Sequence, residues 1–230
     1  SAGDIEMYQG AEYYWQGHHK AFNFFTTVPF GLTGSEHYAW INFGGGQELW
    51  DELSAQFNLK GFANAWTGVQ MGGWFRKEIN KLDDLKGLKF RMPGIGGEVL
   101  RRLGVAVVNL PAAEIFPALQ SGTIDGSEWV GPWNDTMFGF YKIAKYYYAA
   151  GFHEPGTVGS FGINKKTWDG LTDTEREMIT TVMQAEGQWQ TSEFRARDLA
   201  ALNKLVDEHG VQLRSFTNEM YREFGRLSGE

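Results

Sequence analysis

Short runs of β-branched and aromatic residues recur along the chain, and segments with apolar residues at helical spacing lie between them. Each run ends at a glycine, a proline or a polar turn, as β-strands commonly do. The pattern predicts strands within residues 4–10, 85–92, 105–110, 123–130, 144–150, 157–164 and 210–216. The second of these strands stops at Pro93 and Gly94.

Helical spacing marks several of the segments between these strands. Within residues 45–62, Leu49, Leu53 and Phe57 fall on one face of a helix. Residues 27–46 are rich in glycine and turn residues, and we expect turns there. The pattern predicts further helices within residues 11–25, 97–104, 111–122, 172–209 and 217–228.

The longest of these helices begins at a capping box, in which Thr172 is followed three residues later by Glu175. A helix that long suits a bridge between two lobes. Because strands alternate with helices, we expect an α/β protein with largely parallel sheets. Ligand sites in such folds lie at the carboxyl ends of strands. Four polar residues stand at those ends: Gln70, Arg91, Glu128 and Glu154.

Charge and composition exclude some functional classes. The 230 residues carry 28 acidic and 21 basic side chains and a net charge of -7, which argues against nucleic-acid binding. The absence of cysteine excludes thiol catalysis, disulfides and thiolate metal sites, but leaves the compartment open. No apolar stretch is long enough to span a bilayer, and the first ten residues lack the features of a signal peptide.

Each candidate site residue has two readings. Arg91 could hold a carboxylate through two parallel hydrogen bonds, or it could be an ordinary surface arginine. Glu128 could be a metal ligand or a general base, or a solvated loop carboxylate. The neighbouring Trp129 and Trp133 favour an enclosed site.

Glu154 is similar, because it follows an aromatic strand and stands between His153 and Pro155. His153 could bind a metal, although a single histidine is more often a local hydrogen-bonding group. Gln70 offers a neutral oxygen beside two glycines. Hydrolysis gains little support, because the chain has neither a G-x-S-x-G nor an H-E-x-x-H motif.

Three segments resemble a known family: "LKGLKFRMPG", "ALQSGTIDGSEW" and "GFHEPG". They are similar to the substrate-binding receptors of tripartite ATP-independent periplasmic (TRAP) transporters. The residue after the motif glutamate is usually asparagine in the broader family, and here it is Trp129. That tryptophan resembles the branch that binds 2-oxo acids and 2-hydroxy acids, such as pyruvate or lactate, together with a metal cation.

The resemblance implies a role for each matching residue. Arg91 matches the arginine that pairs with the substrate carboxylate. Gln70, Glu128, the Trp129 backbone carbonyl and Glu154 match the metal ligands, and Gln70 and Trp129 also border the substrate. Tyr14 matches a residue of a loop that lines the cleft.

Counting charges favours calcium over sodium at this site. Glu128, Glu154 and the substrate carboxylate bring three negative charges and Arg91 brings one positive charge, so a divalent cation makes the enclosed site neutral. An all-oxygen donor set indicates a hard ion, and two glutamates suit the high coordination number of calcium. Sodium is the second choice.

The resemblance implies a two-lobe periplasmic-binding-protein-like fold with mixed, mostly parallel sheets and a long connecting helix. It covers residues 1–230, with approximate lobe segments at 1–38 and 92–175. It also implies that family members carry a strand and a helix before this sequence and more helix after it.

The expected protein is a periplasmic receptor that performs no chemistry, docks on the membrane permease subunits of a TRAP transporter and binds no nucleic acid. The sequence leaves a homodimer open. The alternative is a metal-dependent lyase or aldolase acting on a 2-oxo acid, since the same residues could polarise a carbonyl.

Overall fold

The computed structural model describes residues 4–230, and their contacts divide into two compact units. The first unit comprises the chain up to Thr27 together with Leu32–Gly68 and Gly156–Glu193. The second comprises Val28–Gly31, Val69–Pro155 and Phe194–Glu230. Each unit is therefore built from segments that are distant in the sequence.

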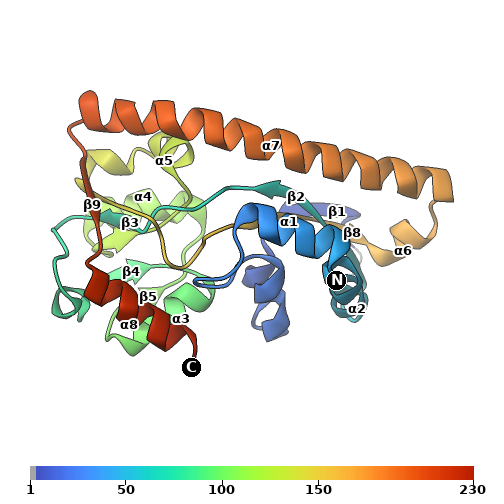
Figure 1. Cartoon of the computed structure of the whole chain (residues 1–230), viewed down its shortest axis with the longest axis horizontal. Helices are drawn as coiled ribbons and strands as arrows, with labels where there is room; N and C mark the ends of the chain where they lie inside the picture. Colours follow the sequence, from blue (N-terminus) through green and yellow to red (C-terminus); the bar gives the residue numbers. More distant parts are fainter. Residues whose placement is uncertain (1–3) are drawn as a thin grey trace. The chain divides into compact units, whose positions relative to one another are not determined.

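The first unit is built on a three-stranded antiparallel sheet in the order β1-β8-β2. Its core is aromatic: the Phe25 ring stacks on Trp50 at a centroid distance of 5.2 Å, and Trp50 is fully buried. The elements of this unit are β1 (Met7–Gly10), η1 (Glu12–Trp15), η2 (Lys20–Phe25), α1 (Gly34–Phe43), α2 (Gly46–Ala55), β2 (Leu59–Trp66), β8 (Val158–Asn164) and α6 (Lys165–Asp169) (Figure 1).

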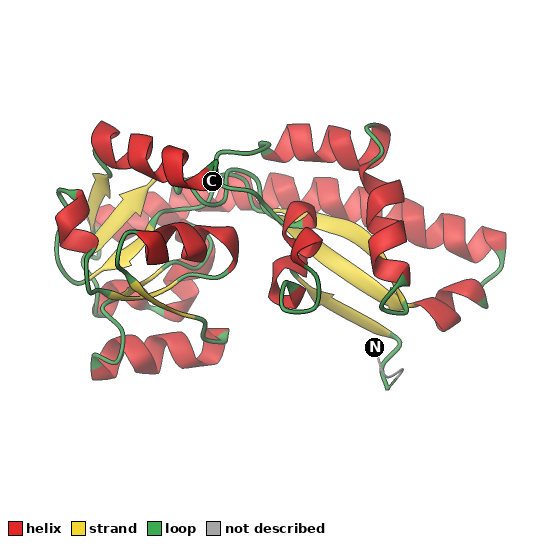
Figure 2. Cartoon of the chain, turned by 90° about the horizontal axis from the view of Figure 1, so that it is seen from below, coloured by secondary structure: helices red, strands yellow, loops and turns green. Residues whose placement is uncertain are grey.

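The second unit is built on a six-stranded sheet in the order β5-β4-β6-β3-β7-β9. Helices cover both of its faces (Figure 2). Its strands are β3 (Gly73–Phe75), β4 (Lys89–Arg91), β5 (Ala106–Val108), β6 (Gly126–Ser127), β7 (Tyr146–Ala149) and β9 (Gln212–Ser215). Its shorter helices are η3 (Leu82–Leu85), α3 (Gly94–Arg102), α4 (Ala112–Ser121), α5 (Pro132–Phe138), η4 (Phe140–Lys142) and α8 (Asn218–Ser228).

Two hydrophobic clusters fill the space between this sheet and its helices. The first contains residues of α3 and α8, including Leu100 and Phe224. The second contains residues of α4, including Ile115 and Leu119. Because both faces are covered by apolar side chains, the sheet supplies a rigid base for the loops at its edges.

The long helix α7 (Asp173–Asp207) begins as the sequence predicts. The Glu175 carboxylate accepts hydrogen bonds from the backbone N–H and the hydroxyl of Thr172, so the capping box is confirmed. The helix contributes residues to both units, with the change falling between Glu193 and Phe194. No helix within residues 4–230 is both long and apolar enough to cross a membrane.

The mixed α/β class is confirmed, but the expectation of mostly parallel sheets is wrong for the described residues. Only β4–β5, β4–β6 and β7–β9 are parallel, and the other four pairings are antiparallel. Alternation of strands and helices predicts parallel pairing where a crossover helix joins two strands, as α3 joins β4 to β5. β3 reaches its neighbours β6 and β7 by other connections, and it runs antiparallel to both.

Several element predictions also need correction. Residues 27–46, where we expect turns, contain the helix α1, which begins at a Thr33–Glu36 capping box. α2 ends at Ala55, so Phe57 lies beyond the helix. The helix buries Trp50 and Leu53, whereas Leu49 is 54% exposed. The segment 11–25 forms short 3-10 helices, α3 begins at Gly94 rather than Gly97, and the strand within 123–130 is only two residues long.

Candidate metal and carboxylate site

The predicted ligands of the second unit lie at the ends of strands of the six-stranded sheet or on the loops that follow them. Arg91 is the last residue of β4, Glu128 directly follows β6, and Glu154 follows β7. Backbone hydrogen bonds join these loops: Glu128 N donates to Arg91 O at 3.2 Å, and Gln70 N donates to Glu154 O at 3.0 Å. The sheet therefore brings residues from four separate sequence regions to one site.

Gly126 allows β6 to fit between its two neighbours. A Cβ atom at this position would lie 2.5 Å from the carbonyl oxygen of Trp74 and 2.8 Å from the Phe90 ring. Those distances are below any real contact, so only glycine permits β3 and β4 to approach β6 this closely. The glycine before Glu128 is thus required by the packing of the strand that positions the carboxylate.

Arg91 and Glu128 form a buried ion pair. Nη1 of Arg91 donates to Oε1 of Glu128, and each side chain is 1% exposed. The same Nη1 lies 3.2 Å from the Glu128 carbonyl oxygen, and Nε donates to Leu110 O at 3.3 Å. The guanidinium carbon stands 5.1 Å from the centre of the Trp129 ring. Arg91 is therefore a buried arginine, and its reading as a surface residue is wrong.

Two further groups border the Glu128 carboxylate. Nε2 of His153 lies 3.4 Å from Oε2 of Glu128, and Glu154 is the next residue along the chain. Ligand atoms of Glu128, His153 and Glu154 all lie within 4.8 Å of one another, and the three residues are buried. The predicted ligands include both carboxylates but not His153. The position of His153 directly before Glu154 was the one sequence feature that could have indicated it.

Gln70 is buried, with 3% of its surface exposed, in the loop between β2 and β3. Its backbone is held on both sides, because its N–H donates to Glu154 O at 3.0 Å and its carbonyl accepts from Gly151 N at 2.8 Å. The backbone of Gln70 therefore lies beside that of Glu154 and of Gly151. Its role as a ligand stays a prediction.

Trp129 lies on the loop that leaves β6, and its ring packs edge-on against Phe138 at a centroid distance of 5.2 Å. The following peptide N–H, that of Val130, donates to Oδ1 of Asp135 at 3.0 Å. Burial raises the pKa of Asp135 to about 7, and hydrogen bonds from Trp74, Tyr147 and Val130 act in the opposite direction. The sequence reading missed this carboxylate.

Tyr14 belongs to the other unit. It lies in η1, is 46% exposed, and meets Tyr13 edge-on at a centroid distance of 4.6 Å. Its role beside a ligand stays a prediction.

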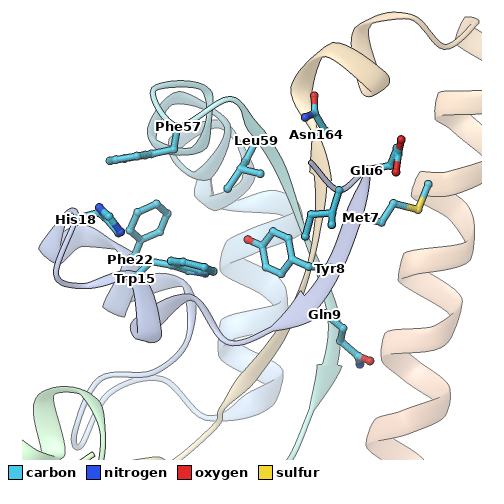
Figure 3. A pocket seen from close by; sticks show the side chains of 11 residues that line it. Glu6, Met7, Tyr8, Gln9, Trp15, His18, Phe22, Phe57, Leu59 and Asn164 are labelled. Atoms are coloured by element: carbon cyan, nitrogen blue, oxygen red, sulfur yellow. The ribbon is translucent and has the colours of Figure 1, made fainter. Parts of the chain in front are cut away.

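The first unit also contains a largely apolar hollow of about 450 Å³ beside β1 (Figure 3). The Tyr8 and Trp15 side chains point toward one another there, with their ring centroids 6.0 Å apart. Neither lysine nor arginine occurs among the residues that line it. Unlike the site around Arg91, this hollow therefore offers neither lysine nor arginine to a carboxylate ligand.

Comparison with known proteins identifies the family. Residues 1–227 match the model of the bacterial extracellular solute-binding proteins of family 7, DctP. The chain belongs to this family. A monocarboxylate 2-oxoacid-binding periplasmic protein of a Nostoc species is 39% identical over 227 residues, which cover 99% of this chain. The chain spans 62% of the length of that relative.

Two solved TRAP periplasmic solute-binding proteins have the same fold as this DctP chain. One, from Pseudoalteromonas atlantica, is 42% identical with a TM-score of 0.95 and holds sodium and pyruvate. The other, from Colwellia psychrerythraea, has the same identity and TM-score and holds calcium and pyruvate. Each matches 99% of this chain, which covers 69% of the first and 70% of the second. The two-lobe receptor fold expected from the sequence is therefore confirmed.

The donor set of this DctP chain fits a metal cation. Glu128 and Glu154 are 0% and 2% exposed, and two buried carboxylates so close together need compensating positive charge. Arg91 supplies one such charge at Glu128. A cation beside both carboxylates would compensate the second, and carboxylate oxygens are ligands that hard cations prefer.

Proposed function

We propose that this chain is the receptor of a TRAP transporter and binds a small 2-oxo or 2-hydroxy monocarboxylate, such as pyruvate or lactate, with a metal cation between ligand and protein. The observation that carries the proposal is the buried cluster of Glu128, His153 and Glu154 beside Arg91. The relatives that hold pyruvate with sodium or calcium support it.

Each residue contributes a distinct part of the affinity. Arg91 forms charge-assisted hydrogen bonds to the ligand carboxylate, which its planar guanidinium suits. The cation would be held by Glu128, Glu154, Gln70 and the Trp129 carbonyl. It would attract the carboxylate and the 2-oxo or 2-hydroxy oxygen of the ligand. The Trp129 ring, which already covers Arg91, excludes water and so strengthens these interactions.

His153 adds a donor that the all-oxygen set did not contain. Its Nε2 atom lies near Oε2 of Glu128 and can orient that carboxylate toward the cation. We retain calcium as the favoured cation, because the charges on Glu128, Glu154, Arg91 and the ligand sum to minus two. Sodium remains the second choice.

The receptor acts in the periplasm and delivers its ligand unchanged to the membrane permease subunits of the transporter. Membership of an extracellular solute-binding family supports this assignment. A lyase or aldolase would consume the 2-oxo acid, so the two functions differ in the fate of the ligand. NMR spectra of pyruvate incubated with the protein and calcium distinguish them, since a receptor leaves the pyruvate signals unchanged over hours.

Calorimetry after exhaustive chelation tests the binding function. We expect no measurable pyruvate binding by the chelated protein and full binding once calcium is restored. Propionate, which keeps the carboxylate and lacks the 2-oxo oxygen, is the matched control ligand and should bind at least about tenfold more weakly, since one charged hydrogen bond or metal contact contributes about 1.5–3 kcal/mol. Equal affinity for pyruvate with and without metal would contradict the proposal.

A further inference from the structure

The peptide group between Trp129 and Val130 has two polar ends with different tasks. Its carbonyl is the proposed cation ligand, and its N–H donates to Oδ1 of Asp135 at 3.0 Å. A peptide group is planar, and its C=O and N–H bonds point in opposite directions. A residue that holds the N–H therefore also sets the direction of the carbonyl.

Asp135 is well placed to hold that N–H still. The side chain is 1% exposed, and its second oxygen, Oδ2, accepts hydrogen bonds from Trp74 Nε1 and from the Tyr147 hydroxyl, both at 2.8 Å. The rings of Trp74 and Tyr147 stack with centroids 3.9 Å apart. These two residues lie on the paired strands β3 and β7, so the carboxylate is fixed to the middle of the six-stranded sheet.

The backbone on the far side of the peptide is held as well. The Val130 carbonyl accepts from Met71 N at 3.0 Å, and Met71 directly follows Gln70. Asp135 is in turn fixed by its place in the first turn of α5, where its N–H donates to Gly131 O at 2.9 Å. Among the described residues, the Trp129–Val130 peptide is thus clamped at its N–H and at the next carbonyl.

The Asp135 carboxyl group accepts hydrogen bonds from three donors, the side chains of Trp74 and Tyr147 and the backbone N–H of Val130. A carboxyl oxygen that accepts the Val130 N–H hydrogen bond polarises the N–H bond and increases the partial negative charge on the Trp129 carbonyl oxygen, since hydrogen bonds in a chain polarise one another. A more negative carbonyl oxygen is a better ligand for a hard cation. Partners beyond the direct ligands contribute to metal affinity in this way.

We propose that Asp135 is a positioning residue of the cation site, which orients and polarises the Trp129 carbonyl through the Val130 N–H. This inference rests on the proposed function, in which that carbonyl holds the cation. It assigns Asp135 a role in holding the metal that acts through the Trp129 carbonyl.

Asp135→Asn tests the inference with little change in volume. An amide offers one oxygen and one NH2 group. The NH2 group must therefore face either the Val130 N–H or the Trp74 indole N–H, and in either place a donor meets a donor. We expect calcium affinity, measured by titration in the presence of pyruvate, to fall about 10- to 100-fold, the usual effect of removing a partner beyond the direct ligands. Tyr148→Phe is the matched control, because it removes a buried hydroxyl from the same strand that bonds Ile79 rather than Asp135.

NMR provides a readout that a general loss of stability would not reproduce. The sequence contains a single Trp–Val pair, so labelling tryptophan carbonyls with 13C and valine amides with 15N selects the Trp129–Val130 peptide alone. In the wild-type protein, calcium with pyruvate should shift the Trp129 carbonyl carbon and move the Val130 amide proton downfield together. In Asp135→Asn the Val130 amide proton should already lie upfield before metal is added.

The outcomes separate this inference from the proposed function. If wild type binds pyruvate with calcium and folded Asp135→Asn binds calcium within twofold of wild type, the inference is overturned and the receptor function stands. If wild type binds no pyruvate with any cation, the receptor function fails and the inference fails with it. If Asp135→Asn does not fold, the wild-type spectra decide, and an unshifted Trp129 carbonyl on metal binding would overturn the inference.

Discussion

The guanidinium of Arg91 donates to the carboxylate of Glu128, and each of the two side chains is 1% exposed. They are 37 positions apart in the sequence, and the parallel pairing of β4 with β6 brings them together. A buried charge without a partner is costly, so each residue stabilises the other in this structure. The two residues assigned to ligand and to metal therefore act as one electrostatic unit.

Arg91→Lys should weaken pyruvate binding. Lysine keeps the positive charge and loses the planar fork that binds a carboxylate through two bonds, so affinity should fall by about 1.5–3 kcal/mol. Isothermal calorimetry with calcium present measures the effect. The control is Arg101→Lys on the surface of α3, where the arginine pairs with Glu98 and both are exposed. Unchanged affinity in Arg91→Lys would remove Arg91 from the binding site.

Glu128→Gln should destabilise the protein in the absence of metal. The amide keeps the shape of the side chain and removes the charge that compensates Arg91, and breaking one side of a buried pair typically costs about 3–5 kcal/mol. Urea unfolding of the chelated protein measures the change. Glu98→Gln, which breaks the exposed pair with Arg101, should cost less than about 1 kcal/mol. A Glu128→Gln protein as stable as wild type would mean that Arg91 finds compensation elsewhere.

Much of the site followed from the sequence because strand ends are local features. The strand that contains Arg91 stops at Pro93 and Gly94, and Glu128 follows a turn at Gly126. Both residues could therefore be placed at the ends of strands without knowledge of the fold. The sequence does not specify strand order, however. The pairing of Arg91 with Glu128 depends on β4 lying beside β6, and no local pattern determines that neighbour.

The errors have similar physical causes. The helix α1 was hidden by its glycines and aromatic residues, although the Thr33–Glu36 capping box marked its start. β3 runs antiparallel to its neighbours because no crossover helix joins it to them, so the rule for parallel sheets did not apply. The sequence did not indicate Asp135, because this residue lies in α5 and its partners Trp74 and Tyr147 lie on the strands β3 and β7.

His37 should make the first unit less stable in mild acid. Burial lowers the pKa of this ring below its usual value, although hydrogen bonds to the Gly156 and Phe24 carbonyls oppose the shift. The folded state therefore keeps the imidazole neutral while the unfolded chain takes up a proton below a pH of about 6.5. The contribution of this group is present above that pH and is lost as the pH falls, at up to about 1.4 kcal/mol per pH unit.

Urea unfolding of wild type and of His37→Gln between pH 5 and 7.5 measures this contribution. Glutamine takes up no proton, so the difference in unfolding free energy between the two proteins should shrink as the pH falls. Other ionisable groups, such as the buried Glu12, whose pKa is raised by burial, affect both proteins equally. A His37→Gln curve parallel to wild type would contradict the assignment.

The balance of charge at the site should decide which cation is bound. Glu128, Glu154 and the ligand carboxylate are negative, and Arg91 is positive, so the site with ligand needs two further positive charges to be neutral. Calcium provides both, whereas sodium leaves one negative charge in a buried position. Of two relatives with this fold, one holds pyruvate with sodium and the other holds pyruvate with calcium.

Glu154→Gln should shift the preference from calcium toward sodium. The substitution keeps an oxygen donor at a residue that is 2% exposed and removes one negative charge, so sodium alone makes the liganded site neutral. After exhaustive chelation, pyruvate affinity is measured with calcium, magnesium or sodium restored separately. Wild type should recover with calcium and bind at least about tenfold more weakly with sodium, since one uncompensated charge in a buried site costs more than about 1.4 kcal/mol. Glu154→Gln should bind pyruvate at least as tightly with sodium as with calcium. Glu98→Gln, on the surface of α3, should behave as wild type. If wild type reaches full affinity in sodium alone and calcium adds nothing, the charge count is wrong and the carboxyl of Glu154 does not act as a charged ligand.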